Sequence, residues 1–429
     1  MTRAAFLPSV VRTGVTITLL VLGGWVSAQE VPPLPGASVD SLLALAREHN
    51  PDYAALQHEL TAAGERVLPA GALMAPRFKL EWEDVTKAGQ QSPTLWPSDV
   101  GSTRYTLSQD LPWAGKRELK REIATQEVEA ARGRAQQTWS DTAARIKALY
   151  AQRYLVRASE RLTNENLDLM LKLEQVLQVR YAGGLAAQQD ITRIHVEHTA
   201  MRSELVALAG EWRQTQSRLN ALLARPVDAP LAAPQGLRPL PEPARLTFAA
   251  LAERLRQASP QLLQESARVR SAEKARELSR KNRYPDFTVG INAMQRQGSV
   301  NEWGVMVELN LPIQTDVLRA QEREAEAMLV AAQSRQEAAL NQSLADLSDS
   351  LSALETARQT EHLMTYSLMP QAELTWRAAL AGYENGKADF ATLLDAQRQI
   401  RQARLSQIKA QVDAQMRLAD IEKLLGEEL

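Results

Sequence analysis

The side chains best suited to hold a metal ion are two histidines, His195 and His198. They lie three residues apart on a predicted helix and therefore share one face. Glu197 and Glu204 are close in sequence, but solvated surface positions account for them equally well. No third ligand stands out, and the ten methionines are scattered rather than clustered. We therefore predict no metal site and no cofactor, with His195 and His198 as the candidates to examine.

Residues that could carry out catalysis do not form a recognisable pattern. The sequence has no cysteine, which excludes disulfides, thiolate metal sites, cysteine nucleophiles and a lipid anchor on an N-terminal cysteine. It also has no phosphate-binding glycine loop, no nucleophile elbow and no His-Glu-x-x-His motif. The formal net charge of −1 creates no field that would attract nucleic acid. We expect neither an enzyme nor a nucleic-acid-binding protein.

Two short turns share one pattern, Tyr-x-x-Gly. The first is Tyr181-Ala182-Gly183-Gly184-Leu185, and the second is Tyr383-Glu384-Asn385-Gly386-Lys387. Each follows a long stretch of helix-forming sequence, and a helical pattern resumes directly afterwards. Glycine pairs and Asn-Gly are typical of tight turns. The two turns therefore predict two copies of one helical hairpin, each with a tip.

The elements that must position these tips are very long helices. We predict helices at 113–181 and 186–224 around the first tip, and at 316–382 and 388–426 around the second. A helix of about 69 residues is roughly 100 Å long, which a compact globule of this size does not easily accommodate. Pro370 is expected to kink the third of these helices, because proline removes a backbone hydrogen bond.

Between the helices, the hydrophobic period changes to two in residues 77–111 and 286–311. Phe78 and Trp82 alternate with charged residues, and Val305 and Leu309 alternate with Gly304, Met306 and polar residues. This alternation predicts two β-hairpins, each with one apolar face and one largely polar face. Prolines at 112 and 312 end the second strand of each hairpin.

The chain reads as a tandem repeat. The same offset separates Pro51 from Pro260 and Pro76 from Pro285. We predict repeat 1 at 29–225, a proline-rich linker at 226–245 and repeat 2 at 246–429. Residues 1–28 have the basic start, short apolar run and small residues of a secretory signal, which we expect to be cleaved near Ala28.

The predicted strands present a closure problem. Four strands per chain cannot form a barrel with an interior, so closure requires several chains around one axis. A lipid-facing outside and a wet inside would explain strands with one apolar and one polar face. Soluble coiled-coil hairpins, in a periplasmic scaffold or adaptor without a pore, are the competing interpretation.

The order of elements, their duplication and the tip motifs resemble the TolC-type outer-membrane efflux proteins across essentially the whole mature chain. The motifs that carry the resemblance are Ala381-Gly382-Tyr383-x-x-Gly386 with Leu393-Leu394-Asp395-Ala396, and Tyr181-x-x-Gly184 with Asp190-Ile191. The segment from Leu111 to Arg117 also resembles the heavy-metal (Czc- and Cus-like) members. The resemblance implies a mainly α fold with β-hairpins, assembled as a homotrimer. Its twelve-stranded β-barrel would cross the outer membrane and continue as an α-helical tunnel through the periplasm.

The same resemblance implies the partners and the cargo. Such a channel contacts outer-membrane lipid, docks to a periplasmic adaptor and receives substrate from an inner-membrane pump of the RND type. It passively exports heavy-metal cations or drugs, since the pump supplies the energy. The residues at the tips would form the adaptor's landing site, namely Tyr181, Gly183, Gly184, Leu185, Asn385, Gly386 and Lys387.

The family's periplasmic gate can be carried over residue by residue. Asp190 would pair with Tyr383, and three copies of Asp395 would line the constriction, where they would repel one another and attract cations. Thr392 occupies the family's second aspartate position. The position of the family's arginine holds Ala388, with Lys387 adjacent. A complete acidic double ring and an arginine latch are therefore not expected.

Overall fold

The computed structural model describes residues 34–296 and 298–429. The predicted secretory signal, 1–28, lies outside the described residues. Residues Pro35–Leu429 form one compact unit, so the two repeats are not separate domains. Within the described part of the chain, no helix combines the length and the apolar character needed to cross a membrane.

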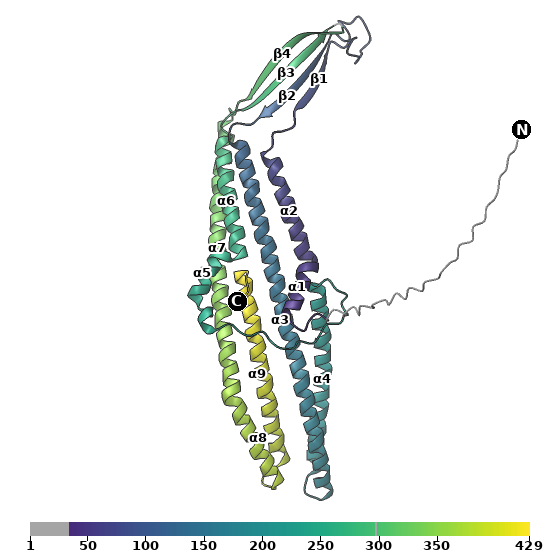
Figure 1. The fold of residues 1–429 in the computed structure, drawn as a ribbon, viewed down its shortest axis with the longest axis vertical. Coiled ribbons are helices and arrows are strands. Elements are labelled where there is room, and N and C mark those ends of the chain that lie inside the picture. The colour runs from purple at the N-terminus through teal and green to yellow at the C-terminus, as the bar shows by residue number, and fades with distance from the viewer. Residues whose placement is uncertain (1–33, 297) are drawn as a thin grey trace, which may run out of the picture. The chain divides into compact units, whose positions relative to one another are not determined.

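The first half contains α1 (Val39–His49), α2 (Pro51–Gly71), β1 (Arg77–Glu83), β2 (Ser102–Leu111), α3 (Lys116–Ala182) and α4 (Gln188–Leu222). The second half contains α5 (Phe248–Ala258), α6 (Pro260–Lys281), β3 (Asp286–Arg296), β4 (Ser299–Asn310), α7 (Thr315–Leu363), α8 (Met369–Glu384) and α9 (Phe390–Leu425). A short 3-10 helix, Pro243–Leu246, ends the otherwise irregular linker. The order of elements is the same in both halves when α7 and α8 are taken together as the counterpart of α3 (Figure 1).

The helix predicted at 316–382, with a kink at Pro370, is interrupted just before that proline. A π turn, Met364–Leu368, separates α7 from α8, and the Met369 N–H donates to the Met364 carbonyl five residues back. Pro370 follows directly and occupies the first turn of α8. Proline has no N–H and its ring crowds the carbonyl four residues earlier, so a wider turn at this place relieves the clash.

The strands form one antiparallel sheet in the order β1-β2-β3-β4. Its register places four apolar residues opposite one another in one row across all four strands. The row consists of Phe78, Leu107, Ile291 and Val305. Side chains one residue along each strand point to the other face, where Lys79, Thr106, Asn292 and Gly304 form the adjacent row.

The apolar face of this sheet is not covered by any described part of the chain. Phe78 is 67% exposed, Ile291 51% and Val305 81%. Trp303 and Val307 on β4 are also exposed. In a soluble protein the apolar face of a sheet is the buried one, whereas the apolar face of this sheet is exposed.

The helix α3 is central to the helical part, because it packs against α2, α4, α6 and α9 (Figure 1). Near the strands its neighbours are α2 and α6, and α6 in turn packs on α7. Near the tips a separate apolar cluster joins α3, α4, α8 and α9. Its members include Met170, Leu177, Ile194, Phe390 and Leu393.

A buried cluster of charges joins α3, α9 and the linker. Lys147 on α3 contacts Glu422 on α9 at 2.9 Å, and both side chains are about 5% exposed or less. Arg238 in the linker donates to both Glu422 carboxylate oxygens, at 3.1 and 3.0 Å. Burial by itself would raise the pKa of Glu422, but hydrogen bonds from Arg238 and Lys147 outweigh burial and hold its pKa below the ordinary value.

Candidate functional site at the hairpin tips

Both tips reverse the chain by the same backbone device. Gly184 and Gly386 have φ values of +70° and +69°, in the left-handed region that glycine adopts without a steric penalty. In the first tip the Leu185 N–H donates to the Arg180 carbonyl at 2.8 Å. In the second, the Lys387 N–H donates to the Gly382 carbonyl at 2.8 Å. These bonds span five residues and complete a helix-ending motif that requires glycine at that position.

The two tyrosines of the duplicated motif have different environments. Tyr181 is 45% exposed, and Leu185 beside it is 74% exposed. Tyr383 is 8% exposed and packs edge-on against Phe390, with ring centroids 5.9 Å apart. The first tip therefore offers an exposed apolar surface, whereas the tyrosine of the second tip belongs to the apolar cluster between the hairpins.

The predicted hydrogen bond between Tyr383 and Asp190 is absent. The Tyr383 hydroxyl is buried and has no hydrogen-bond partner in the described chain. Burial raises the pKa of this phenol, and the nearby Asp190 carboxylate raises it further, while Arg180 opposes both. The Oδ1 atom of Asp190 lies 3.8 Å from Nη1 of Arg193, one turn along the same helix. The tyrosine ring is held by packing in the apolar cluster between the hairpins, and its hydroxyl makes no hydrogen bond there.

The group that does hold Tyr383 is Arg180, which the sequence did not single out. Its guanidinium lies over the tyrosine ring, 4.5 Å from the centroid. Its Nη1 donates to the Tyr383 carbonyl oxygen at 2.9 Å. Arg180 belongs to α3 and Tyr383 to α8, so this pair joins the first tip to the second.

Thr392 makes a local contact at the start of α9. Asp389 begins α9 as its cap and accepts hydrogen bonds from the Thr392 N–H at 2.9 Å and from its hydroxyl at 2.6 Å. These two bonds lower the pKa of the exposed Asp389 carboxyl. Thr392 is thereby committed to the start of the helix.

Asp395 is exposed, at 64% of its side chain, but it is not an isolated negative charge. Arg398, one turn along α9, lies 3.2 Å from it. Arg398 also pairs with Glu197 on α4, where its Nε donates to Glu197 Oε1 at 3.1 Å. The hydrogen bond to Glu197 is the largest of the contributions that raise the pKa of Arg398.

A second bridge between α9 and α4 runs parallel to the first. Arg401 Nη1 lies 2.7 Å from Glu204 Oε2, with both side chains about a quarter to a third exposed. Together with Arg398–Glu197, this bridge fastens the second hairpin to the first. The partners are about two hundred residues apart in sequence, so no local pattern could have paired them.

The two histidines lie against a carboxylate that the sequence did not indicate. Glu174 on α3 contacts His195 Nε2 at 3.0 Å and His198 Nδ1 at 3.2 Å, through its two different oxygens. Glu197 and Glu204, the two carboxylates considered from the sequence, pair with arginines instead. Within residues 34–296 and 298–429, no group of three or more His, Cys, Asp or Glu side chains is arranged to hold a metal ion.

Solved structures share this arrangement of long helical hairpins joined to a four-stranded sheet. A membrane protein from Pseudomonas aeruginosa matches with a TM-score of 0.77 and 19% identity, over 92% of this chain and 91% of that one. CusC matches with a TM-score of 0.78 and 16% identity, over 91% and 92%. VceC of Vibrio cholerae matches with a TM-score of 0.76 and 16% identity, over 91% and 96%. At these identities the likeness establishes the fold alone.

The sequence profile of the outer membrane efflux protein family matches residues 42–225 and 251–427. The chain belongs to this family. Among characterised relatives, the cobalt-zinc-cadmium resistance protein CzcC of Cupriavidus metallidurans is 24% identical over 403 residues, which are 91% of this chain and 90% of CzcC.

Proposed function

We propose that this protein is the outer-membrane exit duct of a tripartite exporter, formed by three copies of the chain. The observation that carries this proposal is the apolar face of the sheet. Phe78, Leu107, Ile291 and Val305 form an uninterrupted row across four strands and are about half exposed or more. Lipid is the surrounding that makes such a face favourable, since each buried apolar side chain gains about 1.5–3 kcal/mol.

The edges of the sheet support assembly around an axis. In the described chain β1 and β4 each pair on one side only, which leaves a row of unsatisfied backbone groups on each. Lipid cannot satisfy them, whereas the edge of a neighbouring copy can. Three four-stranded sheets joined in this way form a closed barrel of twelve strands, continuous with a tunnel of long helices in the periplasm.

The periplasmic gate lies at the hairpin tips in this proposal. Arg180–Tyr383 and Arg398–Glu197 hold the two hairpins of one chain together, and separating the hairpins would widen the tunnel. Asp190, next to Tyr383, and Asp395, beside Arg398, give the constriction its acidic groups. Thr392 serves the gate indirectly by starting α9.

The tip surface is where we place the periplasmic adaptor. Tyr181 and Leu185 are exposed apolar side chains at the first tip. Asn385, Gly386 and Lys387 are exposed at the second. An adaptor that also presents helical hairpins would bury these side chains. Its binding would then act on the contact between Arg180 and Tyr383, which joins the two tips.

The cargo we propose is divalent heavy-metal cations, delivered by an RND-type pump in the inner membrane. The relative named for cobalt, zinc and cadmium resistance supports this choice. The chain would reach the outer membrane after its signal is cleaved near Ala28, with repeats at 29–225 and 246–429 joined by the linker.

Two measurements test the proposal. Cell fractionation should place the protein in the outer membrane as a trimer that converts to monomer on heating. Purified protein should open ion-conducting pores in planar lipid bilayers. A soluble monomer in the periplasm without conductance would instead support the scaffold without a pore.

A further inference from the structure

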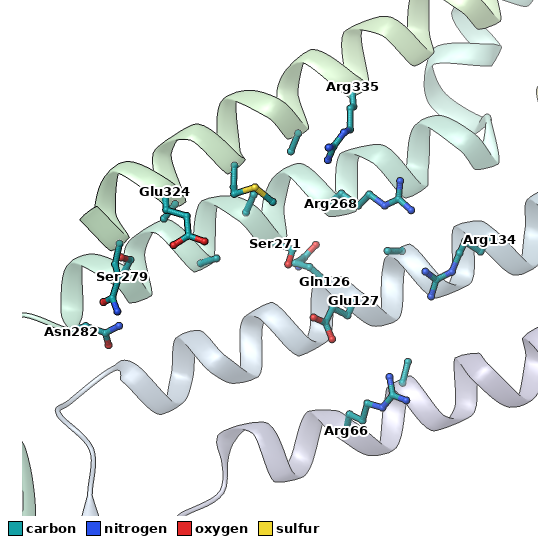
Figure 2. Close-up of a pocket in the computed structure, with 18 residues that line it drawn as sticks. Arg66, Gln126, Glu127, Arg134, Arg268, Ser271, Ser279, Asn282, Glu324 and Arg335 are labelled. Carbon is teal, nitrogen blue, oxygen red and sulfur yellow. The ribbon is translucent and has the colours of Figure 1, made fainter. Parts of the chain in front are cut away.

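A trough of about 760 Å³ runs along one face of the helical wall formed by α2, α3, α6 and α7 (Figure 2). Its floor is made of small side chains, which leave the space open. They are Ala63, Ala130, Ala272, Ala275, Ala325 and Ala332. None of the tip residues lines this trough, so it is separate from the proposed gate.

Four arginines line the trough towards one end, and each comes from a different helix. Figure 2 shows Arg66 on α2, Arg134 on α3, Arg268 on α6 and Arg335 on α7 at this end. We call these four side chains the arginine row. Ser279, Asn282 and Glu324 lie at the opposite end.

Of the four arginines in the row, one forms a salt bridge with a described residue. Arg268 pairs with Glu265 at 2.5 Å. Among the described residues, Arg66, Arg134 and Arg335 form no salt bridge. Glu127 and Glu324, the two carboxylates that line the trough, pair with none of them. Arginine stays protonated at any physiological pH, so this end keeps an excess of positive charge.

We propose that the arginine row binds a multivalent oxyanion of the phosphate or sulfate class. Several positive charges around one open space repel one another, and an anion with several oxygens relieves that repulsion. The planar guanidinium fork matches two oxygens of such an anion at once, which a lone lysine cannot do. The small side chains of the alanine floor leave room for such an anion beside the arginines.

The position of the trough on α3 indicates which face of the helical wall carries it. Ala130 lies 16 residues before Ile146, about 160° around the helix. Ile146 packs in the cluster that contains α1 and linker residue Leu231, so the trough is on the face away from α1 and the linker. In the proposed trimer that face lines the bore. This placement rests on the proposed function, whereas anion binding by the arginine row does not.

Calorimetry with inorganic phosphate tests the site directly. Detergent-solubilised full-length protein should bind phosphate saturably at constant ionic strength, and the double variant Arg134→Gln/Arg335→Gln should bind it at least about tenfold more weakly. Both arginines are exposed and form no salt bridge with the described residues, so the variant should melt at the wild-type temperature. Arg323→Gln is the matched control, because Arg323 is an exposed arginine on α7 outside the trough. We expect it to bind like the wild type.

Two results would overturn the proposal: no saturable phosphate binding by the wild-type protein, or equal binding by the wild type and the double variant. A conductance measurement then separates the site from the duct. In a bilayer with a salt gradient, the double variant should shift the reversal potential towards cation preference relative to Arg323→Gln. Absence of pores would contradict the proposed duct and leave the calorimetric result to decide the anion site.

Discussion

The guanidinium of Arg180 on α3 lies 4.5 Å above the ring of Tyr383 on α8 and donates a hydrogen bond to the Tyr383 carbonyl oxygen. This contact places a cation at the junction between the two hairpin tips. The family pattern would put that cation at position 388, which holds alanine. The junction is therefore fastened from the first repeat, by a residue one position before the Tyr-x-x-Gly motif.

Replacing Arg180 by glutamine should loosen the closed tips. The substitution removes a cation–π contact and a hydrogen bond from a charged donor, together about 1–3 kcal/mol. We expect the resting conductance in planar bilayers to rise about fivefold or more. Arg202→Gln, at an exposed position of α4 without a salt bridge in the described chain, is the control. If the two variants conducted equally, Arg180 would not be the residue that holds the closed tips together.

Removing only the hydroxyl of Tyr383 should change little. The hydroxyl is buried without a partner, so Tyr383→Phe should leave the melting temperature and the resting conductance close to those of the wild type. Tyr383→Ala removes the buried ring as well, at a cost of about 3–5 kcal/mol, and should open the channel. If Tyr383→Phe leaked as much as Tyr383→Ala, the hydroxyl would have a partner in the assembled protein, and the described packing would not explain the gate.

The Arg398–Glu197 bridge should couple the two hairpins measurably. Glu197 is nearly buried, so a double-mutant cycle with Arg398→Gln and Glu197→Gln should give a coupling of about 1–3 kcal/mol in thermal unfolding. The same cycle on Arg401 and Glu204, where the glutamate is more exposed than Glu197, should give less than about 1 kcal/mol. Equal couplings for both pairs would show that burial is not what gives the first bridge its strength.

The buried cluster at Glu422 predicts how stability depends on pH. The pKa of Glu422 is lower in the folded protein than its ordinary value of 4.5, so its contribution is complete above that value and is lost as pH falls through the folded-state pKa. Wild-type protein should therefore lose melting temperature steeply on acidification below about pH 4.5. Glu422→Gln should be less stable near neutral pH and should show a flatter acid limb. Glu427→Gln, which removes a more exposed carboxylate, should follow the wild-type profile. An unchanged acid limb in Glu422→Gln would assign the loss to other groups.

The sequence predicts the fold because its signals are local. Proline and glycine mark the ends of elements, and the change from helical to alternating periodicity marks both β-hairpins. The π turn before Pro370 was not predicted, because proline indicates a disturbance but not the form that the backbone gives it.

The details of the candidate site are less accessible from sequence because they depend on contacts between distant segments. Glu197 and Arg398 are adjacent only because α3, α4 and α9 pack around one apolar cluster. Tyr383 fits the family motif, yet the motif does not reveal that its hydroxyl lacks a partner. Glu174 is one of many glutamates on a long helix, and nothing in its neighbourhood marks it as the partner of His195 and His198.

The central claim is that the apolar face of the sheet lies in lipid and the opposite face in water. The chain has no cysteine, so Val305→Cys and Glu308→Cys each provide a single attachment point for a nitroxide spin label. Both residues belong to β4, and the register places Val305 in the apolar row and Glu308 opposite Thr288 on the other face. In reconstituted membranes, we predict that the label at 305 collides mainly with dissolved oxygen and the label at 308 mainly with a water-soluble nickel complex. If both labels were equally accessible to the nickel complex, the sheet would not lie in the membrane and the proposed duct would be contradicted.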